Sequence, residues 1–420
     1  MKVAFVSQPW DTLNAPVSSG SIPIWTYEAA KRLVARGDCE VTIYARQSEG
    51  QLAYEMAGSI AYRRVSTVGN RVCNAGCKGL TKVSAGFRYL NSRLYCLPYF
   101  WRVARELRRR QYDVVHIHNF SQAVPIVRSL NPNIKIVLHM HCEWLTQFDQ
   151  NVIARRLALC DLVIGCSDYV IEKIRDRFPL FSSITQRVFN GVDIQQFTPA
   201  KTARTTEAQT VLFVGRISPE KGLHTLLSAF EQVAERFPNA QLNIVGPNKP
   251  ASAEFIAELS EDPIVQKLAL LDPPNYLQRL KEQVPDAIAS RISWVGPISH
   301  LQLQDSYHQA DVLVNPSFSE AFGMSLVEAM ASGLPVVATR VGGMVDVVRE
   351  GETGLLVPMD DAVALAGAIG RLLADAPLRV EMGAKGRSRA EKLFSWEAIA
   401  TDLLTHYQTL LEPSHTEAST

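Results

Sequence analysis

Short apolar segments alternate with longer segments of helical periodicity along most of the 420-residue chain. Strands that are apolar at nearly every position are typical of parallel strands buried on both faces. The alternation therefore predicts a doubly wound α/β sheet with helices on both faces. In the first half of the chain, the pattern predicts a helix at residues 24–36 and strands at residues 3–7, 41–45, 114–118, 134–139 and 162–166.

The same pattern begins again after a polar stretch at residues 197–209. It predicts strands at residues 210–214, 241–245, 292–295, 311–314 and 334–338, and helices at residues 223–236, 322–331 and 396–411. Two α/β domains in series are therefore expected, and a cleft between them is the natural site, because ligands of open α/β sheets bind beyond the carboxyl ends of the strands. The predicted parts are a first domain at 1–196, a linker at 197–209, a second domain at 210–390, C-terminal helices at 391–412 and a tail at 413–420.

The composition fits a soluble globular protein, with 47% apolar and 20% charged residues. A net charge of +1 gives the whole chain no bulk attraction to nucleic acid. No apolar run approaches the ~18 residues of a membrane span, and the N-terminus reads as a first strand rather than a signal peptide. The odd count of seven cysteines predicts reduced thiols in a cytoplasm. The pair Cys73 and Cys77 lacks the second pair that a zinc site needs.

Two carboxylates lie at and within the helix predicted at residues 322–331. Glu320 precedes the helix, whose start carries the small residues Gly323 and Ser325, and Glu328 lies inside it. Backbone N–H groups at a helix start stabilise an anion, whereas carboxylates accept hydrogen bonds from hydroxyls, so the pair suits a sugar nucleotide. The alternative is that Glu320 is favoured by the helix dipole alone and that Glu328 is exposed. The apolar neighbours of Glu328 nevertheless predict that it is partly enclosed and has a partner.

Two cations follow the first strand of the second domain. Ser218 and Pro219 read as an N-cap and a proline at the first helical position, which places Lys221 in the first helical turn. Arg216 lies just before this turn. Because the helix dipole disfavours cations there, we interpret the two residues as receptors for an anion. The alternative is an exposed lysine and an arginine that pairs with Glu220.

Four histidines form two H-x-H pairs, each at the end of a predicted buried strand: His116 and His118, then His139 and His141. Residues two apart on a strand share a face. We predict that one imidazole, His141 with His139 as its rival, hydrogen-bonds the substrate and that the other three are structural. Histidines alone could bind a metal, but no carboxylate cluster and no Asp-x-Asp motif supports one, so no metal is expected.

A basic segment at residues 61–111 holds twelve Arg or Lys and one acidic residue, Glu106. Five of its arginines lie at residues 102–110 with helical spacing, directly after an aromatic run at 99–101. This mixture fits contact with anionic lipid or with a phosphorylated acceptor. The alternative is an ordinary solvated helix face.

Each predicted domain has a glycine-containing loop that follows a predicted strand. Gly20, in the sequence Ser18-Ser19-Gly20, suits close backbone approach to a ligand, and Gly342–Gly343 repeats the arrangement in the second domain. Glycine is also ordinary in such turns, so neither loop is specific evidence for a ligand.

With these residues in place, the chain resembles the retaining glycosyltransferases of family 4, which have the GT-B fold. The segment EAFGMSLVE, from Glu320 to Glu328, matches their E-x7-E motif. The agreement extends to NGVD at residues 190–193, FVGR at 213–216, EKG at 220–222 and the glycines at 342–343. The likeness covers nearly the whole chain, although residues 50–98 match poorly.

The resemblance implies two Rossmann-like domains that face a central cleft, a C-terminal helix that crosses back to the first domain, and a nucleotide-diphosphate-sugar donor bound mainly by the second domain. Arg216 and Lys221 would hold the diphosphate. Glu328 would bind the ribose hydroxyls and Glu320 the donor sugar. The implied catalytic set is Glu320, His141, Arg216 and Lys221. The implied donor-binding set also includes Gly20, Phe322, Gly323, Met324, Ser325 and Leu326.

The expected activity is retaining, metal-independent transfer of a sugar from the nucleotide sugar to an acceptor hydroxyl, without a cofactor, in polysaccharide, glycolipid or glycoconjugate synthesis. A sugar-nucleotide 2-epimerase and a non-catalytic nucleotide-sugar-binding subunit are the alternatives. The expected partners are the donor and a sugar or lipid-linked acceptor, with no nucleic acid. We expect a cytoplasmic protein that is peripheral at the inner face of the membrane if residues 61–111 contact anionic lipid.

Overall fold

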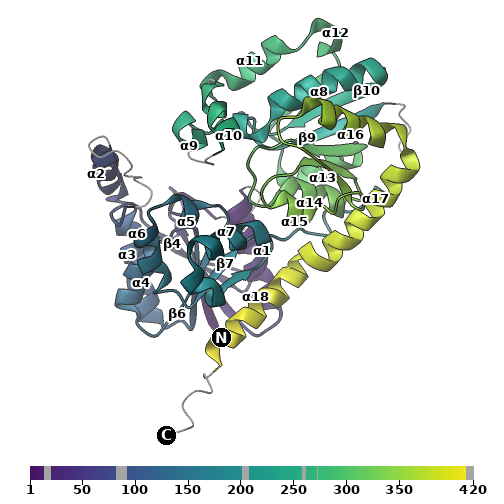
Figure 1. The fold of residues 1–420 in the computed structure, drawn as a ribbon. Coiled ribbons are helices and arrows are strands. Elements are labelled where there is room, and N and C mark those ends of the chain that lie inside the picture. Colours follow the sequence, from purple (N-terminus) through teal and green to yellow (C-terminus); the bar gives the residue numbers. More distant parts are fainter. Residues whose placement is uncertain (14–19, 82–91, 201–207, 258–261, 272, 413–420) are drawn as a thin grey trace. The chain divides into compact units, whose positions relative to one another are not determined.

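The structure, a computed structural model, describes residues 1–13, 20–81, 92–200, 208–257, 262–271 and 273–412 (Figure 1). The chain divides into two compact units. Unit 1 consists of Met1–Phe189 together with Trp396–Thr420, and unit 2 consists of Asn190–Ser395. Each unit is built around its own parallel sheet, as the alternating pattern predicts.

The boundary between the units lies at residue 189, seven residues before the predicted one. Within unit 2, the N–H of Val192 donates to the carbonyl of Phe394 at 2.7 Å. The guanidinium of Arg387 donates to the carbonyls of Phe197 and Ile194 at 2.6 and 3.1 Å. These bonds hold residues 192–197 against the end of unit 2. Of the linker predicted at 197–209, residues 201–207 lie outside the described residues, and Phe197 is fully buried.

Unit 1 contains a sheet in which eight described strands follow the order β3-β4-β2-β1-β5-β6-β7-β8. The strand β3 is antiparallel to β4, and the other neighbours are parallel. The strands are β1 Lys2–Val6, β2 Glu40–Arg46, β3 Tyr54–Ala57, β4 Ile60–Val65, β5 Val114–His118, β6 Lys135–Met140, β7 Leu162–Gly165 and β8 Thr185–Arg187. The described helices are α1 Ser21–Ala35, α2 Asn70–Thr81, α3 Leu97–Arg110, α4 Ala123–Leu130, α5 Trp144–Gln147, α6 Gln150–Leu157, α7 Asp168–Arg177 and α18 Trp396–Leu411.

Unit 2 contains a parallel sheet in which six described strands follow the order β11-β10-β9-β12-β13-β14. The strands are β9 Gln209–Val214, β10 Ala240–Val245, β11 Ile292–Gly296, β12 Val312–Asn315, β13 Val336–Thr339 and β14 Gly354–Val357. The described helices are α8 Leu223–Arg236, α9 Ala253–Ala257, α10 Pro263–Lys267, α11 Tyr276–Gln283, α12 Asp286–Ala289, α13 Leu303–His308, α14 Met324–Ala331, α15 Met344–Val347, α16 Ala362–Ala374 and α17 Ala376–Arg389. Helices α8 and α16 lie side by side on this sheet (Figure 1).

The C-terminal helix α18 belongs to unit 1, which confirms the predicted return of the chain. It packs along α1, and both helices are visible side by side in Figure 1. Trp396 and Tyr407 on α18 are buried, and Trp396 meets Trp25 of α1 edge to face with ring centroids 6.5 Å apart. Arg36, just after α1, adds hydrogen bonds to the Glu397 carbonyl and the Thr401 hydroxyl at 3.0 and 2.6 Å. No helix of the described residues is long and apolar enough to span a lipid bilayer.

A tight helix contact in unit 2 gives a test of this packing. Gly383 of α17 lies against Gly333, at the end of α14, so closely that an added Cβ would sit 2.0 Å from the Gly333 carbonyl oxygen. Gly383→Ala should therefore force α17 away from α14 and destabilise unit 2 by about 1–3 kcal/mol. Urea unfolding of the variant measures the change.

Gly367→Ala is the matched control, because Gly367 also lies inside a helix but has open space around the position of a Cβ. It should stabilise the chain by about 0.5–1 kcal/mol through helix propensity alone. Equal effects of the two substitutions would contradict the close approach of α17 to α14.

Candidate active site

The predicted site residues of unit 2 lie on loops at the carboxyl edge of its sheet and in helix α14. Gly215 and Arg216 follow β9, and residues 316–318 follow β12. The backbones of these loops touch, because a Cβ on Gly222 would lie 2.0 Å from the Pro316 carbonyl oxygen. Glycine is required there for close approach as well as for its φ of 70°.

The Gly342–Gly343 pair, whose sequence alone is nonspecific, supports Glu320 directly. Gly343 donates its backbone N–H to the Glu320 carbonyl at 3.0 Å. A Cβ on Gly342 would lie 1.9 Å from the same oxygen, and its φ is 54°. The loop after β13 therefore fixes the backbone of Glu320, and with it the origin of the Glu320 side chain.

The carboxylate of Glu320 pairs with the ammonium of Lys221 at 2.7 Å, and each side chain is about one-fifth exposed, at 21% and 19%. Lys221 lies in a helical turn that Pro219 begins, as predicted, but this turn is not part of α8. Pro219–Lys221 forms a separate 3-10 turn, Gly222 reverses it in a left-handed conformation, and α8 begins at Leu223. The ion pair with Glu320 explains the position of the Lys221 ammonium.

Ser218 occupies the predicted N-cap position of this turn, but its side chain makes no capping hydrogen bond. Its hydroxyl donates to the buried carboxylate of Glu220 and accepts from the Ala251 N–H at 2.9 Å. The other carboxylate oxygen of Glu220 accepts from Arg216 at 2.8 Å, which is the alternative pairing weighed from the sequence. Arg216 also donates to the Lys249 carbonyl at 3.2 Å, and its side chain is 43% exposed.

These pairs place two guanidinium or ammonium groups on neighbouring loops, each held by a carboxylate. A side chain that is already oriented loses less conformational freedom when a ligand arrives. An anion that binds Arg216 or Lys221 must share each cation with Glu220 or Glu320. The arrangement can hold a phosphate group from one side and accept hydrogen bonds from hydroxyls through Glu320 from the other.

Glu328 is buried on α14, with 5% of the residue exposed, and has two partners. Its carboxylate accepts from His300 Nε2 at 2.9 Å and from the Tyr307 hydroxyl at 2.7 Å. This confirms the prediction of an enclosed carboxylate with a partner. Burial lowers the pKa of His300, but the hydrogen bond and charge of Glu328 outweigh it and leave that pKa raised. Burial and Glu328 raise the pKa of Tyr307.

His300 and Tyr307 were missed from the sequence. They precede Glu328 by 28 and 21 residues and belong to a different helical segment. The only available signal was the carboxylate itself, because a glutamate among apolar helix residues requires a donor somewhere.

Most of the other residues predicted to bind the donor surround the start of α14, which begins at Met324, two residues after the predicted start. Gly323 precedes the helix with a φ of 103°. Phe322 and Leu326 are buried, at 2% and 0% exposure, whereas Ser325 is partly exposed. At this helix start, Ser325 is therefore more accessible to a ligand than Phe322 or Leu326.

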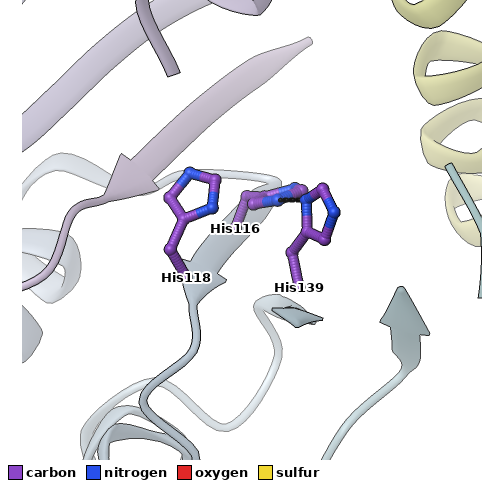
Figure 2. A group of neighbouring side chains, drawn as sticks. All are labelled: His116, His118 and His139. Carbon is purple, nitrogen blue, oxygen red and sulfur yellow. Dashed lines mark hydrogen bonds between the residues drawn. The ribbon is translucent and has the colours of Figure 1, made fainter. Parts of the chain in front are cut away.

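In unit 1, three of the four histidines are fully buried side by side. His116 and His118 lie on β5 and His139 on the adjacent β6, where His118 and His139 are register partners. Figure 2 shows the rings of His116 and His139 directed at each other, with Nε2 and Nδ1 3.0 Å apart. His116 Nδ1 lies 2.7 Å from the Tyr407 hydroxyl of α18.

The fourth histidine, His141, directly follows β6 and is partly exposed. Its Nε2 lies 3.0 Å from His118 Nδ1, and its backbone N–H donates to Asn119 Oδ1 at 2.8 Å. Because His139 is fully buried, this geometry favours His141 as the imidazole that a substrate can reach.

One nitrogen from each of His116, His118 and His139 lies within 4.8 Å of the others, so these residues could hold a metal ion. The group contains no carboxylate among the described residues. A buried dication without a negative partner is unfavourable. In the described part of the chain, His139 Nε2 is buried without a hydrogen-bond partner, whereas the other ring nitrogens of the three residues contact one another, Tyr407, Thr26 and His141, so a largely hydrogen-bonded neutral network accounts for the cluster.

Gly20 is the N-cap of α1 and has a φ of 84°. Its place after β1 suits the predicted close approach of a ligand. Ser18 and Ser19, the other members of that loop, lie outside the described residues. None of the seven cysteines, all of which lie among the described residues, forms a disulfide bond.

The basic segment forms a pocket of about 370 Å³ between β4 and α3. Glu106 is its acidic lining residue, and the arginines that line it are Arg63, Arg64, Arg102, Arg105 and Arg109. Arg102 donates to the carbonyls of Ser66 and Val68, both at 2.9 Å. Trp101, whose ring lies 4.6 Å from the Arg105 guanidinium, is 46% exposed.

Two units, each with a mainly parallel sheet and polar residues at its carboxyl edge, define a two-domain α/β protein. Residues 23–196 match the family model described as Glycosyltransferase Family 4, and residues 194–389 match Glycosyl transferases group 1. The chain is 32% identical to the D-inositol 3-phosphate glycosyltransferase of Corynebacterium diphtheriae, over 97% of this chain and 94% of that protein. This chain belongs to the family 4 glycosyltransferases.

Other comparisons agree with this assignment. Spore coat protein SA of Bacillus subtilis is 28% identical over 73% of this chain and 81% of its own. Among solved structures, sucrose-phosphate synthase from Thermosynechococcus elongatus has a TM-score of 0.72 at 24% identity, covering 98% of this chain and all of that one. Anabaena HepE in complex with UDP-glucose has a TM-score of 0.66 at 18% identity, covering 97% of this chain and all of that one. These structures share the GT-B fold with this chain.

Acidification should destabilise unit 1. Burial lowers the pKa of His116, His118 and His139 well below 6.5, so below about pH 6.5 the unfolded chain binds protons that the native state does not. Each such histidine then costs up to about 1.4 kcal/mol of unfolding free energy per pH unit. Urea unfolding at pH 7.5 and 5.5, followed by tryptophan fluorescence, measures this loss, because of the six tryptophans only Trp294 lies in unit 2.

The variant His139→Asn isolates the effect, because an amide can replace the hydrogen bond to His116 but does not titrate. The free energy of unfolding of this variant should fall less steeply on acidification, by up to about 1.4 kcal/mol per pH unit, the contribution of one histidine. His300→Gln should change the pH dependence of stability in the opposite direction. The raised pKa of His300 contributes stability that is fully present below its unfolded pKa of about 6.5 and is lost as pH rises through its folded pKa. An unaltered pH dependence in His139→Asn would contradict a neutral buried cluster.

Proposed function

We propose that this chain is a retaining, metal-independent glycosyltransferase that moves a sugar from a nucleotide-diphosphate sugar to an acceptor hydroxyl. The proposed setting is the synthesis of a polysaccharide, glycolipid or glycoconjugate. The observation that carries the proposal is the ion pair of Lys221 and Glu320, held at 2.7 Å beside Arg216 on the carboxyl edge of unit 2. The family of the chain and the UDP-glucose in the HepE structure support a nucleotide-sugar donor.

Cleavage of the bond between the sugar and the diphosphate leaves negative charge on the phosphate oxygens. Arg216 and Lys221 stabilise that charge, and they do so more strongly in the transition state than in the ground state because the charge develops there. Glu320 fixes the ammonium of Lys221 and orients the donor sugar through its hydroxyls. With these cations at the leaving group, no metal ion is needed.

Glu328 binds the ribose hydroxyls in this proposal. Each of its oxygens already accepts one hydrogen bond, from His300 or Tyr307, and a carboxylate oxygen can accept a second. The N–H groups at the start of α14, around Gly323 to Leu326, serve the phosphates. Gly20 allows close approach of the ligand, and His141 hydrogen-bonds a substrate hydroxyl.

Retention follows if the acceptor hydroxyl attacks the anomeric carbon on the face from which the diphosphate leaves. The new bond forms between the acceptor oxygen and that carbon, the bond to the diphosphate breaks, and the acceptor proton passes to a departing phosphate oxygen. This step needs no enzymic nucleophile. The anomeric configuration of the product, measured by NMR, tests it.

The experiment for the proposal is a thermal-shift screen of the purified chain with UDP, GDP and ADP and their sugar derivatives, followed by transfer assays in the presence of a chelator. A ligand that binds the native state raises its stability by mass action. Incubation with donor alone, followed by a search for an epimer, tests the 2-epimerase alternative. Transfer by the purified chain would exclude a non-catalytic subunit, and loss of transfer in the chelator would contradict metal independence.

Two substitutions separate the roles within the ion pair. Lys221→Ala should abolish the thermal shift by the nucleoside diphosphate alone and lower kcat by roughly 10²–10³-fold, since it removes charge from the leaving group. Glu320→Gln should keep the shift by the nucleoside diphosphate but lose transfer, because its role is on the sugar.

Lys385→Ala is the matched control, because Lys385 forms an ion pair of similar length, 2.6 Å, with Glu381 on an exposed face of α17. It should leave binding and transfer unchanged. Near-normal turnover of a folded Lys221→Ala variant would defeat the proposed role of the diphosphate site.

We also propose that the arginine-lined pocket of unit 1 contacts the phosphates of an anionic membrane, which would bring a lipid-linked acceptor to the enzyme. Arg105 and Arg109 point to this role because they are exposed on α3 beside the half-exposed Trp101. An aromatic ring next to cationic side chains is typical of interfacial segments.

Sedimentation with vesicles tests this contact. The double variant Arg105→Ala/Arg109→Ala should bind vesicles rich in anionic lipid about 30-fold more weakly, given about 1 kcal/mol for each basic residue near the surface. Arg340→Ala/Arg371→Ala, which removes the same charge from the exposed surface of unit 2, is the control. Equal binding of both variants, or binding insensitive to salt, would contradict the proposal.

A further inference from the structure

We infer that Thr26 and His118 set the tautomer of His141, so that His141 carries its proton on Nε2 and offers Nδ1 as a hydrogen-bond acceptor to a hydroxyl of the bound substrate. Thr26 and His118 are then positioning residues, buried behind the residue that meets the ligand. The acceptor role of His141 rests on the proposed function. The tautomer itself rests only on hydrogen bonds within unit 1.

The first link is the hydroxyl of Thr26 on α1. Its oxygen lies 2.8 Å from the Ile22 carbonyl oxygen and 3.1 Å from His118 Nε2. A carbonyl can only accept, so the single hydroxyl proton goes to Ile22. The contact with His118 must then be a bond in which Nε2–H donates to the Thr26 oxygen.

The second link is the imidazole of His118. It is fully buried, and burial together with His116 and His141 lowers its pKa, so the ring is neutral and carries one proton. With that proton on Nε2, Nδ1 holds a lone pair. His141 Nε2 lies 3.0 Å from this Nδ1 and must therefore be the donor. A neutral His141 then has its lone pair on Nδ1.

The ring of His141 is held in place as well as in one tautomer. It lies 4.0 Å from the ring of His139, centroid to centroid, and 5.8 Å from Trp25, edge to face. Trp25 also contacts the rings of His116, His118 and His139, with centroids 5.3, 5.3 and 4.7 Å away. The relay is therefore enclosed by aromatic rings, so water cannot readily exchange the protons of His118.

Removal of the Thr26 hydroxyl should reverse the relay. In Thr26→Val, a proton on His118 Nε2 would be a buried donor without an acceptor, which is unfavourable. His118 should then place its proton on Nδ1 and donate to His141 Nε2, which moves the His141 proton to Nδ1. The variant would thus present a donor where the wild type presents an acceptor, with a side chain of nearly the same shape.

The experiment measures the tautomers directly, in protein labelled with ¹⁵N-histidine at pH 8, by long-range ¹H–¹⁵N correlation. The signals of His118 and His141 are assigned by their loss in His118→Gln and His141→Gln. We expect Nε2–H for both residues in the wild type and in Thr26→Ser, and Nδ1–H for both in Thr26→Val. Thr405→Val is the control, because Thr405 makes the same bond to a carbonyl four residues earlier on an exposed face of α18.

Steady-state kinetics with the donor found in the ligand screen tests the consequence for the substrate. Thr26→Val should lower kcat/KM about tenfold, the value of one hydrogen bond, and Thr26→Ser should restore it. A purely structural role of Thr26 would change stability without the reversal of tautomers.

Three results would overturn the relay: Nδ1–H on His141 in the wild type, an unchanged His141 signal in Thr26→Val, or reversed tautomers with unchanged kcat/KM. If Thr26→Val fails to fold, the wild-type spectrum still decides the first of these. Absence of transfer by the wild-type chain with every nucleotide sugar would defeat the proposed function, whereas the spectra would still support or overturn the tautomer assignment.

Discussion

The site in unit 2 depends on the hydrogen bonds that the buried carboxylate of Glu328 accepts from His300 and Tyr307. A buried charge is stable only with partners, and His300 and Tyr307 supply them from the segment before β12. The pair ties α14 to that segment, and α14 in turn sets the position of Gly323 and the loop that carries Glu320. The two hydrogen bonds to Glu328 therefore help to fix the geometry of a stretch whose exposed groups are available for a ligand.

The same requirement for partners explains the cations. Arg216 and Lys221 each form an ion pair with a nearby glutamate, Glu220 and Glu320 respectively. Such pairing keeps the edge of the sheet close to electroneutral while its groups stay oriented. In unit 1, burial keeps the three imidazoles neutral, and among the described residues no carboxylate belongs to their group.

Local pattern predicted much of this fold. The helices at 223–236 and 396–411 begin and end as predicted, because each has a continuous apolar face and a break directly before it. The strands β3 and β4 were missed, because they lie at an edge of the sheet and carry polar residues such as Arg63 and Arg64. Ser218 and Pro219 predicted the start of the turn at Lys221 but not its type, because a proline after a serine fits a 3-10 turn as well as an α-helix. The partners of Glu328 could not be found, since their contact depends on how distant segments pack.

Unit 1 is assembled from both ends of the chain, with all of unit 2 encoded in between. During synthesis on the ribosome, the segment up to Phe189 emerges long before α18, which supplies the Tyr407 hydroxyl to His116. His116 and the side of α1 that packs against α18 therefore remain incompletely covered while unit 2 is translated. A premature stop before Trp396 would keep every residue at the carboxyl edge of the unit 2 sheet and still leave unit 1 without the last helix of its core.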